Sequence, residues 1–478
     1  MMKLSQALKD IAQIPNDIDC QVKGLSCDSR QVKEGYLFVA IKGFKQDGHL
    51  FLNQAKNQGA SCALVENIDN SVSLPQIKVG NTRLALAKAA ANFYNHPTAD
   101  LNLIGVTGTN GKTTITYILE SIFKAAGQKT GVVGTVNYRI GEESYPVSHT
   151  TPESVELQKL FASMKEAHVK TAVMEVSSHA AQLHRVDDCQ FNQVIFTNLT
   201  QDHLDFHKNF DDYFAAKRRL FEINDKALQV INIDNEYGQL LTELGQNTRT
   251  YSLSKDADFK AGEIVIGDLS SRFNVYFEGR TYEFELMLGG LFNIYNTLAA
   301  ITSAISDGIE PEVVQHGLFN LKAVPGRFEI MRPNNKAFKI IIDYAHTPDG
   351  LENLLKAARQ VTAGKLITVF GCGGERDKGK RPKMGKIASS LSDEAIVTSD
   401  NPRSEEPEAI ITQITEGNDW FSTQVDRREA IQAALRMAEE QDTVVIAGKG
   451  HEATQEIDGE HLPFSDKEVV NELIGGIS

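Results

Sequence analysis

Runs of apolar residues that end abruptly in a polar cluster recur along this chain, and they constrain its fold more than any other feature. Segments of this kind occupy residues 101–106, 171–176, 194–199, 339–343, 366–370, 395–398 and 443–447. Near-continuous apolar strands that alternate with helices are typical of parallel sheets buried on both faces. Such sheets bind ligands at the carboxyl ends of their strands. The pattern therefore predicts an α/β fold with ligand sites where the strands end.

The domain organisation is predicted from chain length and from the places where this pattern changes. A chain of 478 residues is long enough for three domains of about 150 residues each. Residues 1–98 consist of short mixed segments, whereas the strand–helix alternation fills 99–324 and resumes over 325–478. Turn-forming Pro and Gly stand near both divisions, in 95–97 and 323–326. We therefore expect three domains with these boundaries.

Charge and composition exclude several classes of protein. Lys and Arg number 49 against 63 Asp and Glu, a formal net charge of −14. This argues against a general nucleic-acid binder, because such proteins need a basic surface. No apolar run approaches the ~20 residues that span a bilayer, and the N-terminus lacks a signal-peptide core. The five cysteines include no CxxC pair, so we expect free thiols in a cytoplasmic protein. We also expect a monomer that has neither a membrane nor a nucleic-acid partner.

The strongest chemical signal is the sequence TGTNGKTT at residues 107–114, which follows a predicted strand and precedes a helical pattern. A glycine-rich loop in this position binds phosphate through backbone N–H groups at a helix N-terminus. Lys112 would reach the β- and γ-phosphates of a nucleotide, and the hydroxyl of Thr113 would bind Mg²⁺. The strict pattern GxxxxGK[ST] fails at Val106, where it needs glycine. The alternative is a glycine-rich turn that only caps the helix.

Four further residues are candidates for the same chemistry, and each also has an ordinary structural interpretation. Glu175 ends a predicted strand and could complete a Mg²⁺ site facing the loop, or it could simply be solvated. His203 is an unexpected Mg²⁺ ligand, since magnesium prefers oxygen, and a structural histidine is the alternative. Lys217 lies on an amphipathic helical segment and could be a surface lysine. Arg327 could brace a transferring phosphoryl group or form an interdomain salt bridge.

Taken together, the motifs of this chain closely resemble those of the ATP-dependent Mur ligases of peptidoglycan precursor synthesis. The resemblance covers essentially the whole chain and rests on 107–114 (TGTNGKTT), 174–179 (MEVSSH), 198–203 (NLTQDH), 216–218 (AKR), 291–298 (LFNIYNTL), 326–329 (GRFE), 343–349 (DYAHTPD), 400–403 (DNPR) and 448–452 (GKGHE). The family's loop is built on GTNGKT, which accounts for the displaced glycine. Within the family, the motifs match the members that add the third residue of the stem peptide.

The resemblance implies a fold and a role for each domain. The first domain would bind the uridine end of the substrate. The second, a mostly parallel sheet of the phosphate-loop type with helices, would bind ATP and Mg²⁺. The third would be Rossmann-like and would bind the incoming amino acid. The ATP-binding residues implied in this way are Gly108, Thr109, Asn110, Gly111, Lys112, Thr113, Thr114, Asn293, Arg327 and Asp343.

The resemblance also implies the remaining site residues. The UDP-sugar-peptide would be bound by Cys27, Ser29, Phe44, Lys45, Gln46, His149, Thr150, Thr151, Ser177 and Arg185. The amino acid would be bound by Arg376, Asp400, Asn401, Pro402, Arg403, Gly448 and Glu452. The metal ligands would be Thr113, Glu175, His203 and Lys217, with Lys217 carbamylated. The catalytic residues would be Lys112, His203, Lys217 and Arg327.

The implied reaction joins an amino acid to UDP-N-acetylmuramoyl-L-alanyl-D-glutamate through an acyl phosphate. The expected amino acid is meso-2,6-diaminopimelate, because lysine-adding members lack the arginine of the segment 400–403. An L-lysine-adding member is the first alternative. A folylpolyglutamate-type ligase shares the phosphate loop but would not be expected to carry this segment. A nucleotide-binding regulator without catalysis is the non-enzyme alternative. The candidate residues that argue against it are Lys112, Glu175, His203 and Lys217.

Overall fold

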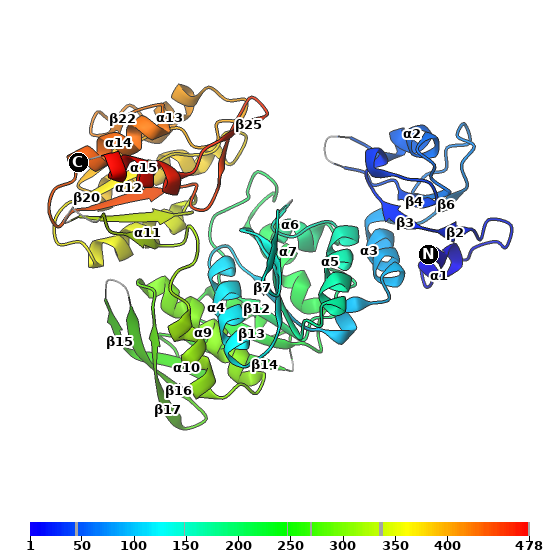
Figure 1. Cartoon of the computed structure of the whole chain (residues 1–478), viewed down its shortest axis with the longest axis horizontal. Coiled ribbons are helices and arrows are strands. Elements are labelled where there is room, and N and C mark those ends of the chain that lie inside the picture. Colours follow the sequence, from blue (N-terminus) through cyan, green and yellow to red (C-terminus); the bar gives the residue numbers. More distant parts are fainter. Residues whose placement is uncertain (44–45, 148, 246, 268–269, 334–337, 477–478) are drawn as a thin grey trace.

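The structure of this chain, a computed structural model, describes residues 1–43, 46–147, 149–245, 247–267, 270–333 and 338–476. Three main sheets follow one another along the sequence, each with its own helices (Figure 1). The predicted α/β fold is confirmed. The predicted division after residue 98 falls within a short 3₁₀ turn, Pro97–Asp100, and the division after residue 324 falls between a helix and the first strand of the third sheet. Both boundaries stay predictions.

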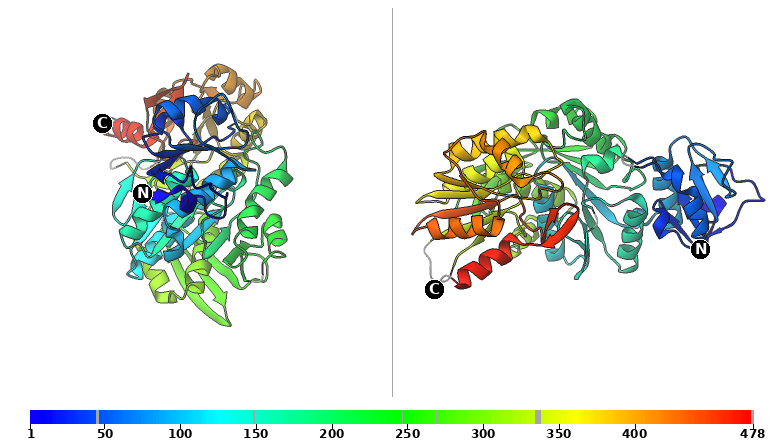
Figure 2. Two further views of the ribbon diagram at one scale, coloured as in Figure 1. Left: turned by 90° about the vertical axis from the view of Figure 1, so that its right-hand side faces the viewer. Right: turned by 90° about the horizontal axis from the view of Figure 1, so that it is seen from above.

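The N-terminal sheet has four parallel strands in the order β3-β4-β5-β6, with a separate antiparallel pair, β1 and β2. Its elements are β1 (Met2–Lys3), α1 (Leu4–Ala7), β2 (Gln21–Val22), β3 (Gly24–Ser26), η1 (Ser29–Gln31), β4 (Tyr36–Val39), η2 (Gly48–Phe51), α2 (Leu52–Asn57), β5 (Cys62–Val65), β6 (Gln76–Lys78), α3 (Thr82–Phe93) and η3 (Pro97–Asp100). Figures 1 and 2 show this part set to one side of the other two sheets.

The central sheet has eleven strands in the order β10-β9-β8-β11-β7-β12-β13-β14-β15-β16-β17. Its elements are β7 (Asn102–Thr107), α4 (Lys112–Ala125), β8 (Thr130–Val133), β9 (Tyr138–Ile140), β10 (Glu143–Tyr145), α5 (Ser154–Glu166), β11 (Thr171–Glu175), α6 (Ser178–Gln182), β12 (Gln193–Phe196), α7 (Phe210–Glu222), β13 (Leu228–Asn232), α8 (Glu236–Leu241), β14 (Thr248–Ser252), β15 (Phe259–Ile266), β16 (Ser271–Phe277), β17 (Arg280–Leu286), α9 (Leu291–Ser306) and α10 (Pro311–Asn320). The seven neighbouring strands β8, β11, β7, β12, β13, β14 and β15 pair in parallel. The strands at both edges of the sheet, β9 and β10 on one side and β16 and β17 on the other, pair antiparallel.

Burial on both faces explains why the central strands are apolar along their whole length. Alternate residues of a strand point to opposite faces. In β7, Ile104 and Val106 pack with residues of α4, α9 and α10, whereas Leu103 packs with residues of α5 and α7. Strands β11, β7 and β12 are direct neighbours, so the polar segments after them meet at one edge of the sheet.

The C-terminal sheet has six strands in the order β18-β19-β23-β20-β21-β22, and only β18 is antiparallel to its neighbour. Its elements are β18 (Glu329–Met331), β19 (Lys339–Asp343), α11 (Pro348–Gln360), β20 (Leu366–Phe370), η4 (Lys378–Lys380), α12 (Arg381–Leu391), β21 (Glu394–Val397), α13 (Pro407–Thr415), β22 (Ser422–Thr423), α14 (Arg427–Met437), β23 (Thr443–Ala447), β24 (Thr454–Ile457), β25 (Glu460–Pro463) and α15 (Asp466–Gly476). Helices cover both faces, since Ile341 packs with residues of α11 and α12 and Ile340 with residues of α14 and α15.

The five cysteines are free thiols. Three of them, Cys62, Cys189 and Cys372, are buried. None of the helices in the described ranges is both long and apolar enough to cross a membrane.

Candidate active site

A cavity of about 550 Å³ lies where the carboxyl ends of the central strands face the C-terminal sheet. The loop between β7 and α4 lines it, together with residues of α7 and of the segment around β19. Residues predicted for nucleotide and metal chemistry meet here: Thr109, Asn110, Gly111, Lys112, Thr113, Thr114, Glu175, His203, Lys217, Arg327 and Asp343. The fold thus brings together side chains that are far apart in the sequence.

The loop before α4 depends on two glycines. Gly108 and Gly111 have φ angles of +149° and +91°, which side chains rarely adopt, and a β-carbon on Gly108 would collide with Thr197. Lys112 folds back over the loop, where its Nζ donates to the carbonyl oxygens of Gly108 and Thr109 at 2.9 and 2.8 Å. Burial lowers the pKa of Lys112. The ammonium thus lies within the cradle of the loop, which fits an anionic ligand there.

Lys217 lies on α7 and is buried, with 1% of its surface exposed. Its Nζ donates to the carbonyl oxygen of Gly108 at 2.8 Å and lies 4.5 Å from the centre of the Tyr213 ring. Burial, and then the neighbouring charge of Lys112, hold the pKa of Lys217 well below its ordinary value. The burial excludes the surface-lysine interpretation. A neutral amine is also the form that reacts with CO₂, although the carbamylation itself stays a prediction.

The oxygen atoms expected to bind Mg²⁺ surround the same loop. Glu175, at the end of β11, is 1% exposed and accepts from the backbone N–H and the hydroxyl of Thr135 at 2.8 and 2.9 Å. The Thr113 hydroxyl accepts from Arg327 at 3.0 Å. These oxygens and a carbamylated Lys217 are the hard donors that Mg²⁺ prefers, so the residues fit this ion. No group of three or more His, Cys, Asp or Glu forms a preformed metal site among the described residues.

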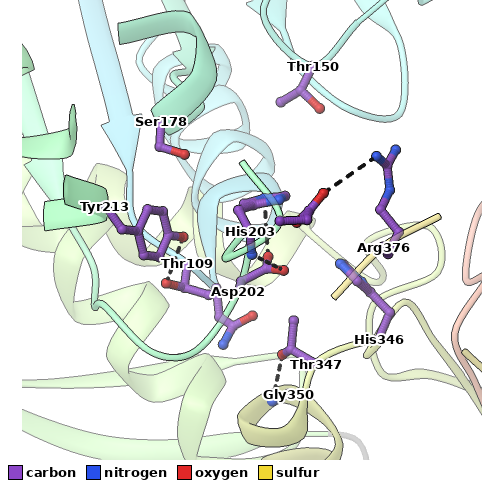
Figure 3. A network of polar contacts seen from close by, with 12 residues as sticks. Thr109, Thr150, Ser178, Asp202, His203, Tyr213, His346, Thr347, Gly350 and Arg376 are labelled. Atoms are coloured by element: carbon purple, nitrogen blue, oxygen red, sulfur yellow. Dashed lines mark hydrogen bonds and ion pairs between the residues drawn. The ribbon is translucent and has the colours of Figure 1, made fainter. Parts of the chain in front are cut away.

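His203 follows β12 in a left-handed conformation, with φ +54°. Its Nε2 lies 3.2 Å from the carboxylate of Asp202 (Figure 3). The ring of His179 stands edge-on to the imidazole at 4.9 Å between centroids. Burial lowers the pKa of His203 to about 3. The ring is therefore neutral near pH 7, as a metal ligand must be.

Two predicted nucleotide-binding residues have structural contacts of their own. Asp343, at the end of β19, accepts from two backbone N–H groups at 2.6 and 2.7 Å. Asn293 on α9 is buried, donates to a backbone carbonyl at 2.7 Å and is not among the residues that line the cavity. Asn296, one turn further along α9, does line it. Asn296 was not predicted, although the motif at 291–298 contains it.

A smaller cavity of about 190 Å³ adjoins the first. The residues predicted to bind the amino acid line it, except Pro402: Arg376, Asp400, Asn401, Arg403, Gly448 and Glu452. Asp202, His203, Tyr344 and His346 line both cavities. A group held in one cavity would therefore border on a group held in the other.

The smaller cavity presents charges of both signs. Arg403, in a left-handed conformation with φ +54°, pairs with Glu456 at 2.9 Å and donates to the carbonyl oxygen of Gly374 at 2.6 Å. Glu452 accepts from Lys449 at 3.0 Å. Such a cavity suits a ligand that carries both ammonium and carboxylate groups.

The residues predicted for the sugar-peptide are divided between two regions. In the central part, Thr150 and Ser177 line the large cavity. Arg185 donates to the carbonyl oxygen of Thr151 at 2.8 Å, and His149 is exposed.

The other members of this set belong to the N-terminal part. Ser29 is buried and its hydroxyl donates to a glutamine side chain at 2.9 Å. Burial raises the pKa of Cys27 to about 12, so it is a neutral thiol. Gln46 is exposed. Phe44 and Lys45 lie outside the described residues.

Several residues at the border of the two cavities were not predicted. Asp202 belongs to the motif at 198–203, and Tyr344 and His346 belong to the motif at 343–349. Both motifs contributed to the resemblance to the Mur ligases. The spacing of residues within each motif does not indicate that the segments 198–203 and 343–349 meet at the border of the two cavities.

Comparison with known families identifies the class of this protein. Residues 21–94 match the catalytic domain of the Mur ligase family, residues 106–304 the Mur ligase middle domain, and residues 326–450 the Mur ligase glutamate ligase domain. The chain therefore belongs to the Mur ligase family, whose members are ATP-dependent amide ligases.

Several relatives that match this chain over nearly its whole length belong to one branch of the family. A relative from Syntrophomonas wolfei named UDP-N-acetylmuramoyl-L-alanyl-D-glutamate–2,6-diaminopimelate ligase is 44% identical over 487 residues, which cover 99% of both chains. A solved structure of a protein with this name is 32% identical, with a TM-score of 0.71 over 99% of both chains. The name denotes the MurE members of the family, the branch that the sequence motifs indicated.

The folylpolyglutamate alternative shares the architecture only. Folylpolyglutamate synthase from Mycobacterium tuberculosis is 20% identical to this chain, with a TM-score of 0.64 over 77% of this chain and 93% of that one. Identity at this level shows a common fold and not a common substrate.

Proposed function

We propose that this protein joins meso-2,6-diaminopimelate to UDP-N-acetylmuramoyl-L-alanyl-D-glutamate at the expense of ATP, through an acyl phosphate. The observation that carries the proposal is the shared border of the two cavities. One contains the phosphate loop, and the other has the charges that suit a zwitterion. An activated carboxyl group formed in the first could therefore be attacked by an amine held in the second.

In the first step, the γ-carboxylate of the D-glutamyl residue attacks the γ-phosphate of ATP. A carboxylate must be activated because hydroxide is too poor a leaving group. Lys112 and Arg327 supply positive charge against the charge that develops on the transferring phosphoryl group. Both line the large cavity, and Arg327 is bonded to Thr113 of the loop.

The residues of this chain also fit Mg²⁺, which when bound would neutralise phosphate charge. Thr113, Glu175, His203 and a carbamylated Lys217 would hold it. Carbamylation would replace the amine of Lys217 with an anionic oxygen donor that faces Lys112, so that the Lys112 ammonium would gain a partner of opposite charge.

Selection of the amino acid is proposed to rest on Arg403 and Glu452. Diaminopimelate differs from L-lysine by a carboxylate on the carbon that bears the distal ammonium. A guanidinium can bind that carboxylate with two parallel hydrogen bonds, and Glu452 can accept from the ammonium. With L-lysine, Arg403 would lack this partner, and sites built around a polar group reject analogues that lack it.

The sugar-peptide is proposed to extend from the large cavity to the N-terminal sheet, because the residues predicted to bind it lie in both places. The acyl phosphate would be hydrolysed in bulk water, so the central and C-terminal parts must exclude water during the reaction. We further propose that the protein works in the cytoplasm as a monomer.

An omission experiment tests the function. ATP, Mg²⁺, UDP-N-acetylmuramoyl-dipeptide and one amino acid at a time are incubated with the protein, and phosphate release and product mass are measured. We expect a product that contains diaminopimelate, formed only when all components are present. Turnover with folate and glutamate in place of these substrates, or no turnover with any amino acid, would contradict the proposal.

A further inference from the structure

Formation of the amide bond requires a base that removes a proton from the attacking amino group, and none of the residues discussed so far has been given this role. The inference that follows rests on the proposed function. The amino group of a free amino acid is an ammonium group near pH 7, and it has no lone pair with which to attack. A proton acceptor is therefore needed at the place where the amino acid meets the acyl phosphate.

The border between the two cavities offers four side chains for this role: Asp202, His203, Tyr344 and His346. Both carboxylate oxygens of Asp202 already contact His203: Oδ1 accepts from its backbone N–H at 2.9 Å, and Oδ2 lies 3.2 Å from its Nε2. His203 is itself a predicted metal ligand. Burial raises the pKa of Tyr344, so its hydroxyl keeps its proton. His346 remains.

The contacts of His346 fix which ring nitrogen can take a proton. Nδ1 lies 2.8 Å from the carbonyl oxygen of Tyr344. Because a carbonyl oxygen only accepts, Nδ1 must carry the hydrogen, and the lone pair of the neutral ring is on Nε2. Within the part of the chain that the structure describes, no hydrogen bond engages Nε2. Figure 3 shows the ring directed toward Asp202 and His203.

The backbone of His346 is also held in place. Lys380, which is 6% exposed, donates to the carbonyl oxygen of His346 at 2.8 Å. The ring of Tyr344 lies edge-on to the imidazole at 4.7 Å between centroids. Among the described residues, the protein therefore positions the imidazole without a hydrogen bond to Nε2.

We propose that His346 is the general base of the ligation step, and that its Nε2 accepts a proton from the amino group of the incoming amino acid. The nitrogen lone pair forms the new C–N bond, and the C–O bond to phosphate breaks with its electron pair on phosphate. Of the two protons that the ammonium loses, one passes through Nε2 to solvent and the other leaves on the departing phosphate.

The charges that face His346 are compatible with this role. Burial lowers the pKa of the imidazole, the charges of Lys380 and Arg327 lower it further, and Asp202 and the bond to Tyr344 act in the opposite direction. The ring is therefore unprotonated at pH 7 and available as a base. The carboxylate of Asp202 would stabilise the imidazolium that forms.

The substitution His346→Asn separates a base from a structural contact. The asparagine amide can still donate to the carbonyl oxygen of Tyr344, but it has no group that takes a proton where Nε2 stood. We expect kcat for ligation of diaminopimelate to fall by about 10²-fold or more. The deficit should shrink as pH rises, because more of the amine then loses its proton to solvent.

Hydroxylamine provides the second measurement. It is largely uncharged at neutral pH and attacks acyl phosphates without help from a base, giving a hydroxamate. We expect the His346→Asn protein to form hydroxamate from ATP and UDP-N-acetylmuramoyl-dipeptide at a rate close to that of the wild type. His461→Asn, at an exposed position of β25, is the matched control and should leave both reactions unchanged.

Two results would overturn the proposal. If His346→Asn lowers hydroxamate formation as much as ligation, the residue supports the fold or the phosphoryl step and is not the base. If it lowers neither, the residue has no role in proton transfer. A wild-type protein that forms hydroxamate but ligates no diaminopimelate would instead contradict the proposed amino acid, and the comparison would then be made with the amino acid that it does ligate.

Discussion

Lys112 and Lys217 share one acceptor, the carbonyl oxygen of Gly108, at 2.9 and 2.8 Å. Burial, and then the charge of the Lys112 ammonium, lower the pKa of Lys217 and favour its neutral amine. A carbamate on Lys217 would place an anionic oxygen donor beside the loop and next to this ammonium. The predicted modification would thus give Lys112 a neighbour of opposite charge.

We expect Lys217→Ala to lose activity by about 10²-fold or more, as when a group that stabilises transition-state charge is removed. A small carboxylate in the buffer, such as acetate, should restore part of it by filling the space of the carbamate. Lys226→Ala, at an exposed lysine after α7, serves as the control and should keep its activity. Full activity of Lys217→Ala without added carboxylate, in bicarbonate-free buffer, would contradict a role for the carbamate.

At the scale of single elements, the parallel core was predictable and the antiparallel edge was not. Strands β7, β11 and β12 are buried on both faces, so each reads as one apolar run. Strands β15 and β16 alternate buried and partly exposed residues. This alternation is a weaker sequence signal than a continuous apolar run, and the pairing of these strands depends on their neighbours. The antiparallel edge formed by β15, β16 and β17 was therefore not predicted from the sequence.

The loop before α4 can be tested by comparing two glycines. In Gly108→Ala the β-carbon would collide with Thr197, so we expect loss of nucleotide binding and of stability. In Gly279→Ala, at the turn between β16 and β17, φ is +72° but nothing lies within 4 Å. This control should lose only the 1–2 kcal/mol, roughly, of a left-handed alanine and keep its turnover. ATP binding and thermal unfolding measure both; normal ATP binding by Gly108→Ala would contradict the role of the loop.

At the scale of the whole molecule, the site exists only where the central and C-terminal sheets meet. Asn110 donates to Asp349 at 2.7 Å, and Arg327 donates to Thr113 at 3.0 Å. Family motifs named most of the residues that line the large cavity. They did not indicate that His346 would border both cavities, because this depends on how two different sheets pack against each other and not on any local spacing.

Arg327 tests this interface. It lies 4.4 Å from the centre of the Tyr344 ring and reaches the phosphate loop from the C-terminal side. We expect Arg327→Ala to lower kcat by about 10²–10³-fold while KM for diaminopimelate changes little, because the charge is needed in the transition state. Arg327→Lys, which keeps the charge without the planar fork, should recover part of kcat. A rise in KM with an unchanged kcat would place Arg327 in substrate binding instead.

The most direct test of the proposed function compares kcat/KM for meso-diaminopimelate and L-lysine in the wild type and in Arg403→Ala. We expect the wild type to prefer diaminopimelate by at least about 10²-fold, since L-lysine lacks the distal carboxylate that Arg403 would bind in addition to Glu456. We expect this preference to be largely lost in Arg403→Ala. If that variant keeps the preference, the specificity lies elsewhere, with Arg376 as the next candidate. Equal or better use of L-lysine by the wild type would contradict the assignment of diaminopimelate as the substrate.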